Sequence, residues 1–254
     1  MILLVEFVVD DILNRKVKVV QLKNGYRFSV DPIILVHFVS VKGKKRVIDL
    51  GTGTGIIPIL LGYRYPDVEI VGIDIVEEFI EAAQEGVKLN KLDNVKVIRG
   101  DINKVEELFA PGSFDIVITN PPYMPLNSGR VTNSWSKLIS RYEWKVSLQG
   151  VVKAASYLLP TKGYLYMIHK PESITRLFVS LTEHNLPPKE VKLVHSYISK
   201  DAEFILLKCT KGGKNIAKVL PPLIMYNSDG TFTEEFKSVY QEMGGEQNVE
   251  MGLH

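Results

Sequence analysis

The chain has 254 residues, of which 45% are hydrophobic and 24% are charged, and its formal net charge is +2. These values are ordinary for a soluble globular protein, and no apolar run approaches the ~20 residues that a membrane helix needs. The single cysteine, Cys209, excludes an internal disulfide and a multi-cysteine metal site.

Residues 1–45 predict an extension in front of the main domain. Val17–Gln21 and Tyr26–Phe28 flank Lys23-Asn24-Gly25, and an Asn-Gly pair is a strong hairpin signal. Asp31-Pro32 suits the start of a helix that runs to about Val39. The first residues carry acids and lack a basic signal-peptide segment, so we expect a cytoplasmic protein.

Residues 46–212 alternate between strand-like and helical periodicity, which predicts one α/β domain. The expected strands are 47–50, 68–74, 95–98, 114–119, 163–169, 191–197 and 203–209, and the expected helices are 56–64, 76–90, 104–109, 145–159 and 173–185. Repeated strand–helix units predict a mostly parallel sheet with helices on both faces. No helix separates the last two strands, so we expect them to form an antiparallel hairpin at the end of the sheet.

Residues 213–254 predict a C-terminal extension. Pro221–Tyr226 is expected to be extended, and Thr233–Met243 is expected to be a helix. Gly244–His254 is expected to be disordered.

A glycine-rich turn follows the first strand of the domain, in the run Asp49-Leu50-Gly51-Thr52-Gly53-Thr54-Gly55. Missing side chains let this backbone turn sharply and approach a ligand, and the helix after it offers N–H groups to a carboxylate. The nicotinamide fingerprint G-x-G-x-x-G would place glycine at position 56, where this chain has Ile56. The turn therefore favours a nucleoside cofactor other than NAD.

Acidic residues end the next two strands, as a nucleoside site requires. Asp74 is placed to accept hydrogen bonds from two ribose hydroxyls. Asp101 is placed to accept from an adenine amino group while Ile102 packs on the ring, and Asp49 could meet an ammonium group. Helix capping is the alternative for Asp74 and Asp101. Together with the glycines, these acids favour a nucleoside cofactor.

Asn120-Pro121-Pro122-Tyr123 follows the fourth strand of the domain. The side-chain carbonyl of Asn120 and the backbone carbonyl of Pro121 can each accept one hydrogen of a planar amino group, and the prolines stiffen the loop. Tyr123 offers a ring for stacking on a base. A rigid turn without function is the alternative, but the glycine turn upstream favours a catalytic role for all four residues.

These motifs resemble the class I methyltransferases that modify amino groups, over about residues 45–210. More narrowly, the chain resembles the bacterial tRNA(Val) adenine-N6 methyltransferases, which act on adenine 37. That likeness also includes Gln21–Leu35, Ser140–Glu143 and Pro221–Tyr226. In the family a histidine usually separates the arginine and glutamate of the second stretch, whereas Tyr142 stands here.

The resemblance implies a Rossmann-like fold with a seven-stranded, mostly parallel sheet, and S-adenosylmethionine as cofactor. The expected cofactor residues are Asp49, Gly51, Thr52, Gly53, Gly55, Asp74, Ile75, Asp101, Ile102 and Asn120, and the resemblance adds Arg27 and Asp31 at the border of the cofactor or target pocket. The expected substrate residues are Phe28, Tyr123, Arg130, Trp135, Lys137 and Arg141, with ordinary packing as the alternative for Phe28 and Trp135. The last four lie in a long connection, residues 124–144, which is typical of a lid or binding loop.

The charge distribution suits a polyanionic partner. Residues 1–46 carry nine Lys or Arg against four acids, and residues 192–218 carry six lysines against two acids. The expected partner is RNA, and the resemblance implies tRNA; no metal and no membrane are expected, and a monomer is favoured. The alternatives are methylation of a release-factor glutamine, methylation of guanine N2 in ribosomal RNA, and an RNA-binding module with a relic cofactor site.

Overall fold

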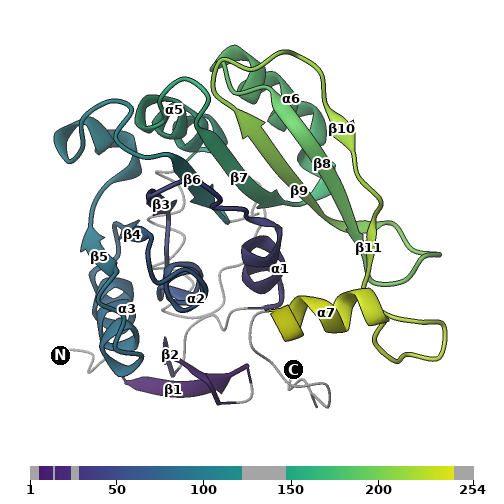
Figure 1. Cartoon of the computed structure of the whole chain (residues 1–254), viewed down its shortest axis with the longest axis horizontal. Helices are drawn as coiled ribbons and strands as arrows, with labels where there is room; N and C mark the ends of the chain where they lie inside the picture. Colours follow the sequence, from purple (N-terminus) through teal and green to yellow (C-terminus); the bar gives the residue numbers. More distant parts are fainter. Residues whose placement is uncertain (1–5, 14, 24–28, 122–146, 243–254) are drawn as a thin grey trace, which may run out of the picture.

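The computed structural model describes residues 6–13, 15–23, 29–121 and 147–242. Within these residues the main sheet contains β3 (Arg46–Leu50), β4 (Glu69–Asp74), β5 (Val95–Arg99), β6 (Ile116–Thr119), β7 (Tyr164–His169), β8 (Pro188–His195), β9 (Ala202–Thr210), β10 (Lys218–Val219) and β11 (Leu223–Ile224). The strand order is β10-β8-β9-β7-β6-β3-β4-β5, and β11 also pairs with β8. This mixed, mostly parallel sheet confirms the expected α/β fold (Figure 1).

The central strands are apolar on both sides because helices cover both faces of the sheet. Every residue of β6 is buried, and in β3 only Arg46 is partly exposed. Neighbouring residues of one strand serve opposite faces: Val47 packs with one core cluster and Ile48 with the other. This is the pattern of parallel strands buried on two sides.

One face of the sheet is covered by α1 (Asp31–Phe38), α2 (Ile56–Arg64) and α3 (Glu77–Leu89). The other face packs against η1 (Ile102–Glu107), α5 (Leu148–Leu158) and α6 (Ile174–Glu183), which follows the short turn η2 (Pro171–Ser173). The expected α-helices are confirmed: α2 has the predicted ends, and α1, α3, α5 and α6 differ from the expected ranges by a few residues at their ends. The short helix expected at 104–109 is the 3-10 helix η1, which begins two residues earlier and has a kink at Lys104.

The antiparallel end of the sheet is confirmed, and it is wider than expected. β9 inserts between β7 and β8 and is antiparallel to both. Beyond these seven strands the chain returns along the outer edge of β8, where β10 and β11 each pair in parallel. Pro221 and Pro222 lack the N–H that a continuous edge strand would donate, so the pairing breaks into two short pieces.

An N-terminal hairpin lies against the helices on one face, at the foot of the molecule in Figure 1. It pairs β1 (Phe7–Ile12) with β2 (Val17–Leu22). The sequence analysis predicted β2 but not β1, and the expected Asn24-Gly25 turn and Tyr26–Phe28 strand lie outside the described residues. Asn90, at the end of α3, joins the hairpin by donating to the Lys18 carbonyl at 2.6 Å and accepting from the Lys18 N–H at 2.9 Å.

The C-terminal extension packs into the same core as α1. Its helix, α7 (Glu234–Glu242), confirms the expected helix, and Phe236 and Val239 are fully buried. Tyr226 stacks on Phe232 with ring centroids 5.0 Å apart. The expected disordered tail, 244–254, lies outside the described residues. No helix within the described ranges is long and apolar enough to cross a membrane.

Candidate active site

Four parallel strands end at one edge of the sheet, and their ends form the candidate site. β3 pairs with β4 on one side and with β6 on the other, so the direction of the strand order reverses between β3 and β6. In open α/β sheets, ligands bind beyond the carboxyl ends of the strands at such a switch point. The glycine turn after β3 and Asn120 after β6 therefore open at the same edge.

The glycine turn folds back onto the end of β4. The N–H groups of Gly51 and Thr52 both donate to the Ile73 carbonyl, at 3.0 and 2.9 Å. Gly55 has a φ of 81° and caps α2, and an added Cβ there would lie 2.7 Å from the Cβ of Ala83. Glycine is therefore needed at this position both for its backbone conformation and for the close approach of α2 to α3.

Asp74 connects the glycine turn to β4. One carboxylate oxygen accepts from the Gly53 N–H at 2.9 Å, and the other accepts from the Val76 N–H at 3.0 Å. Burial raises the pKa of this carboxyl above its ordinary value. Each oxygen has more than one acceptor position, so both oxygens can still receive hydroxyl donors from a ribose.

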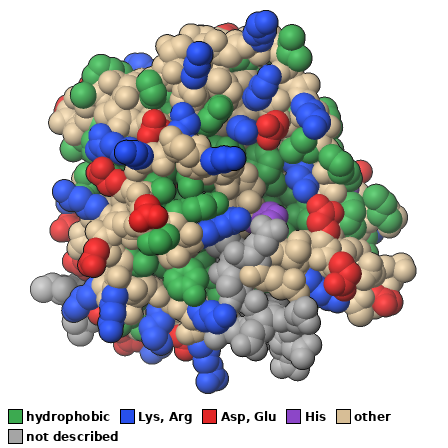
Figure 2. Space-filling model, viewed as in Figure 1, with side chains coloured by type: hydrophobic (Ala, Val, Ile, Leu, Met, Phe, Trp, Pro, Cys, Tyr) green, Lys and Arg blue, Asp and Glu red, His purple; other side chains and the backbone are tan. Residues whose placement is uncertain are grey.

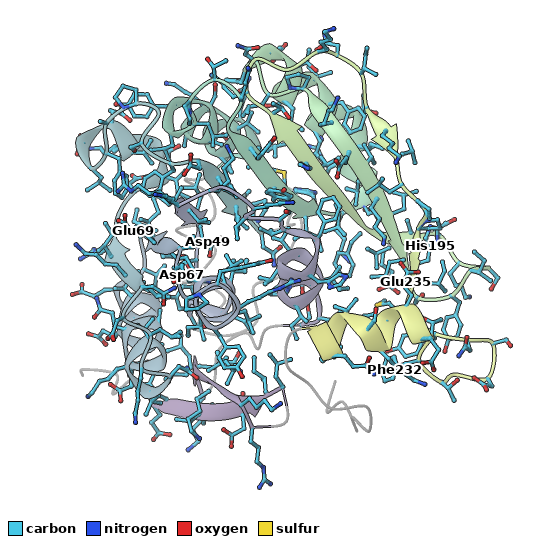
Figure 3. The ribbon with its side chains drawn as sticks, in the orientation of Figure 1. Asp49, Asp67, Glu69, His195, Phe232 and Glu235 are labelled. Carbon is cyan, nitrogen blue, oxygen red and sulfur yellow. The ribbon has the colours of Figure 1, made fainter. Side chains whose placement is uncertain are left out.

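Asp49 is a fully buried carboxylate, and among the described residues neither of its oxygens has a hydrogen-bond partner. It lies on β3, among the buried residues of the central sheet (Figure 3). Burial is the main reason that the pKa of the Asp49 carboxyl is raised to about 7; the neighbouring Thr52 hydroxyl opposes this shift, and the nearby charge of Asp74 adds to it. A buried carboxylate without a partner is costly, so this position fits a ligand that brings a cation, such as an α-ammonium group.

Asp101 and Ile102 begin the next element beyond β5. One oxygen of Asp101, Oδ1, accepts from the backbone N–H and the side-chain amide of Asn103, at 2.9 and 3.1 Å. The capping role considered for Asp101 is thus present in the structure, and both bonds use the same oxygen. Ile102 is buried, and its Cδ1 lies 3.7 Å from where a Cβ of Gly51 would be. This side chain therefore forms an apolar wall beside the glycine turn.

Asn120 follows β6 and contacts the N-terminal extension. Its Nδ2 donates to Oδ2 of Asp31 at 2.7 Å, and the Ser29 hydroxyl donates to the other oxygen of Asp31. Thr119, one residue earlier, donates through its hydroxyl to the Leu50 carbonyl at 2.9 Å. The end of β6 is therefore tied to β3 on one side and to the start of α1 on the other.

The sequence analysis did not foresee this link between Asp31 and Asn120. A family resemblance alone placed Asp31 at the border of the cofactor or target pocket, and Asp31 and Asn120 are 89 positions apart in the chain. The remaining expected site residues lie outside the described residues; they are Arg27, Phe28, Pro122, Tyr123, Arg130, Trp135, Lys137 and Arg141.

The lysines of residues 192–218 are partly engaged within the protein. Lys192 pairs with Glu235 at 2.9 Å, Lys208 pairs with Glu190 at 3.2 Å, and Lys211 donates to Ser156. The other three, Lys200, Lys214 and Lys218, are exposed. Figure 2 shows Lys and Arg side chains spread over the visible face among Asp and Glu.

The ring of His169 takes part in a local hydrogen bond with the backbone. His169 accepts from the Lys170 N–H at 2.8 Å, and burial lowers its pKa. Figure 3 shows His195 at the end of β8, above the C-terminal extension that carries Phe232 and Glu235. Among the described residues, no group of three or more His, Cys, Asp or Glu side chains could hold a metal ion.

Comparison with known proteins finds a matching family model and related sequences. A family model described as a methyltransferase domain matches residues 41–192. A tRNA1(Val) (adenine(37)-N6)-methyltransferase of Bacteroides thetaiotaomicron is 25% identical over 239 residues, which are 91% of this chain and 92% of the relative. A release factor glutamine methyltransferase of Aliivibrio fischeri is 26% identical, over 61% of this chain and 55% of the relative.

A solved structure has the same α/β fold as this chain. A crystal structure described as a predicted O-methyltransferase from Agrobacterium tumefaciens superposes with a TM-score of 0.69 and 21% sequence identity. The match covers 85% of this chain and 97% of that chain. It therefore includes most of both molecules.

Proposed function

From the premise that this chain belongs to the methyltransferase-domain family and is an S-adenosylmethionine-dependent enzyme, we propose that it methylates the exocyclic N6 of an adenine in tRNA. By resemblance the target is adenine 37 of a valine tRNA. The observation that carries this proposal is the shared edge of the sheet, where the glycine turn and Asn120 open side by side. A donor and a flat acceptor group bound at these two positions meet at one place.

The described residues fit the cofactor. Asp49 would receive the ammonium group, which gives its buried carboxylate a partner. Asp74 would receive the ribose hydroxyls, and Ile102 would pack on the adenine ring, with Asp101 accepting from its amino group. When bound, the cofactor supplies a methyl carbon on a positively charged sulfur.

The amino group of an adenine is a weak nucleophile because its lone pair is delocalised into the ring. The Asn120 side-chain carbonyl and the Pro121 backbone carbonyl would accept its two hydrogens and orient the lone pair. The target nitrogen then forms a bond to the methyl carbon, the sulfur–carbon bond breaks with its electrons going to sulfur, and one amino proton passes to solvent. Asn120 is neutral, so its role is orientation, and correct orientation is worth about 7–11 kcal/mol in intramolecular reactions.

An RNA loop nucleotide is the substrate that this site favours. The base must leave its stack to reach an edge of the sheet, and an unpaired base does so at lower cost than a paired one. We propose that the N-terminal extension, residues 1–45, covers the target side of the core domain, residues 46–212, and that residues 213–254 form a C-terminal extension. The contacts of α1 with α7 and with Asn120 support this division.

Methylation of a protein glutamine is the second candidate, because a glutamine amide is also planar and a release factor glutamine methyltransferase is among the relatives. The share of this chain that each relative matches favours tRNA as the substrate. The tRNA-modifying relative aligns with 91% of this chain, extensions included, whereas the release-factor relative aligns with 61%.

A labelling experiment tests the proposed function. The protein is incubated with methyl-labelled S-adenosylmethionine and either total tRNA or a release factor, with Asn120→Ala as the control. We expect label in tRNA, and N6-methyladenosine after digestion to nucleosides and mass spectrometry. Label that enters the release factor but not RNA would reject the proposal, and N2-methylguanosine would point to the guanine alternative.

A further inference from the structure

The contact between Asp31 and Asn120 joins the first helix of the fold to the proposed catalytic loop. The carboxamide nitrogen of Asn120 lies 2.7 Å from Oδ2 of Asp31. Asp31 is a carboxylate from a different part of the chain and is only 4% exposed. A bond to a charged acceptor in such a site is stronger than one between neutral groups.

The chemistry of this bond decides which way the Asn120 carboxamide points. Asn carries a carbonyl oxygen on one branch and an NH₂ group on the other, and the two branches have nearly the same shape. An ionised carboxylate can only accept hydrogen bonds, so the branch that faces Asp31 must be the NH₂. The carbonyl oxygen is then on the branch that does not face Asp31. An Asn that accepts a hydrogen from a target amino group needs that orientation.

Asp31 is itself held in place. The Ser29 hydroxyl donates to its second oxygen, and Asp31 is the first residue of α1. The next residues of this helix, Pro32 to Val36, are all buried. α1 also contacts both α2 and α7, which fixes the helix from two sides. The carboxylate is therefore presented from a rigid element.

A carboxylate at this distance also changes the electrostatics of the target pocket. Hydrogen bonds in series polarise one another, so a negative charge on the NH₂ side makes the Asn120 carbonyl oxygen a stronger acceptor. The target nitrogen gains positive charge as it attacks the methyl group. A stronger acceptor stabilises that charge in the transition state more than in the ground state, and this difference raises kcat.

We propose that Asp31 is a positioning residue for methyl transfer, which orients and polarises the carboxamide of Asn120. This inference rests on the proposed function, because it assigns the role of a second residue in the same site. The family resemblance implies that Asp31 borders the cofactor or the target pocket, so a role in cofactor binding is the competing assignment. The two assignments predict different kinetic constants.

The test compares wild type with Asp31→Asn, Asn120→Ala and the double variant. For each protein, kcat on tRNA is measured at saturating cofactor, and the Kd for S-adenosylmethionine is measured by calorimetry. Asn at position 31 keeps the size of the side chain but can face Asn120 with either branch and carries no charge. We expect Asp31→Asn to lower kcat about tenfold or more, with little change in cofactor Kd. In the Asn120→Ala background it should cause no further loss, because the carboxamide that it acts on is gone.

Asp115→Asn is the matched control. Asp115 is also a carboxylate that accepts hydrogen bonds, from the backbone N–H groups of Lys45 and Arg46 at 2.9 and 3.1 Å. It precedes β6, so it lies at the opposite edge of the sheet from Asn120. We expect this variant to change thermal stability without changing kcat. If Asp31→Asn does not fold, Ser29→Ala provides the second variant, since it loosens the carboxylate but keeps its charge. It should lower kcat by a smaller factor.

Two results would overturn the inference. One is a weaker cofactor Kd with unchanged kcat, which would make Asp31 a cofactor residue. The other is an unaltered loss from Asp31→Asn in the Asn120→Ala background. The wild type in the same assay tests the proposed function separately. If it methylates a release factor instead of tRNA, the substrate assignment fails, and the role of Asp31 is decided from the same constants on that protein.

Discussion

Asn120 is the residue on which the proposed chemistry depends most directly. Its contact with the target amino group is expected to be stronger in the transition state than in the ground state. We predict that Asn120→Ala lowers kcat at least about a hundredfold and leaves the cofactor Kd little changed. Steady-state kinetics with tRNA and calorimetry with S-adenosylmethionine measure the two quantities. Unchanged turnover would remove Asn120 from its assigned role.

Asp49 predicts a pH-dependent stability in the absence of ligand. Its pKa in the folded chain is about 7, well above the ordinary value for an aspartate, so the folded state holds more protons than the unfolded state between these values. Its contribution to stability is therefore lost as pH rises from about 4 to about 7. Asp49→Asn removes this titration. We expect the variant to be more stable than wild type at pH 8, and the difference to shrink at pH 5.

Urea unfolding at the two pH values, without cofactor, measures this effect. The same substitution should weaken S-adenosylmethionine binding about tenfold or more, because the neutral amide no longer attracts an ammonium group. A gain in stability together with a loss of binding would show that the buried charge is kept for the ligand. Equal pH dependence in both proteins would mean that another group titrates in this range.

At the level of elements, the geometry of the turn between β3 and α2 predicts that a substitution of Gly55 strongly lowers stability. Alanine there must adopt a φ of 81° and would place its Cβ 2.7 Å from the Cβ of Ala83. We expect Gly55→Ala to lower the free energy of unfolding by about 2–4 kcal/mol, from backbone strain and from the clash between α2 and α3. Denaturant unfolding gives this value.

Gly230 is a matched control for Gly55. Its φ is 84°, but an added Cβ would meet no atom within 4 Å. Gly230→Ala should therefore show the cost of the backbone alone, about 1 kcal/mol. The difference between the two variants isolates the steric contact. Equal losses would argue that α2 moves away from α3 without penalty.

The sequence was most informative about elements whose pattern is local. The strand and helix series from β3 to β7 follows from apolar runs and glycine turns, and α2 has the predicted ends, Ile56 and Arg64. β1 was missed because its residues, FVVDDI, do not alternate between apolar and polar side chains, and only its pairing with β2 makes it a strand. The interruption of strand pairing at Pro221 and Pro222 could likewise not be predicted, because it depends on the pairing of β10 and β11 with β8.

The site residues that have a local sequence signal could also be predicted. The glycine turn, Asp74 and Asn120 carry their own signals, since each stands at the end of a predicted strand. The bond from Asn120 to Asp31 has no such signal, because it depends on how α1 packs on the sheet. Asp101 differs again. The helix capping that the sequence allowed as an alternative is present in the structure, although Asp101 is also proposed to bind the cofactor.

At the level of the whole molecule, the two terminal extensions meet over one face of the core. Phe236 of α7 is fully buried in the cluster that also contains Ile33 and Ile34 of α1. Asp31 begins α1 and contacts Asn120. A substitution that disturbs the packing of α7 should therefore displace α1, and with it the Asp31 carboxylate that contacts Asn120.

We predict that Phe236→Ala lowers the free energy of unfolding by about 3–5 kcal/mol and also lowers kcat below the level that the folded fraction explains. Leu181→Ala provides the comparison, because Leu181 is equally buried but lies in α6, on the opposite face of the sheet. It should cost about 2–5 kcal/mol and leave kcat per folded molecule unchanged. Both stabilities are measured by denaturant unfolding, and kcat is measured well below the unfolding temperature. If the two variants affect kcat equally, the packing of α7 on α1 does not control the position of Asp31, and the C-terminal extension contributes to stability alone.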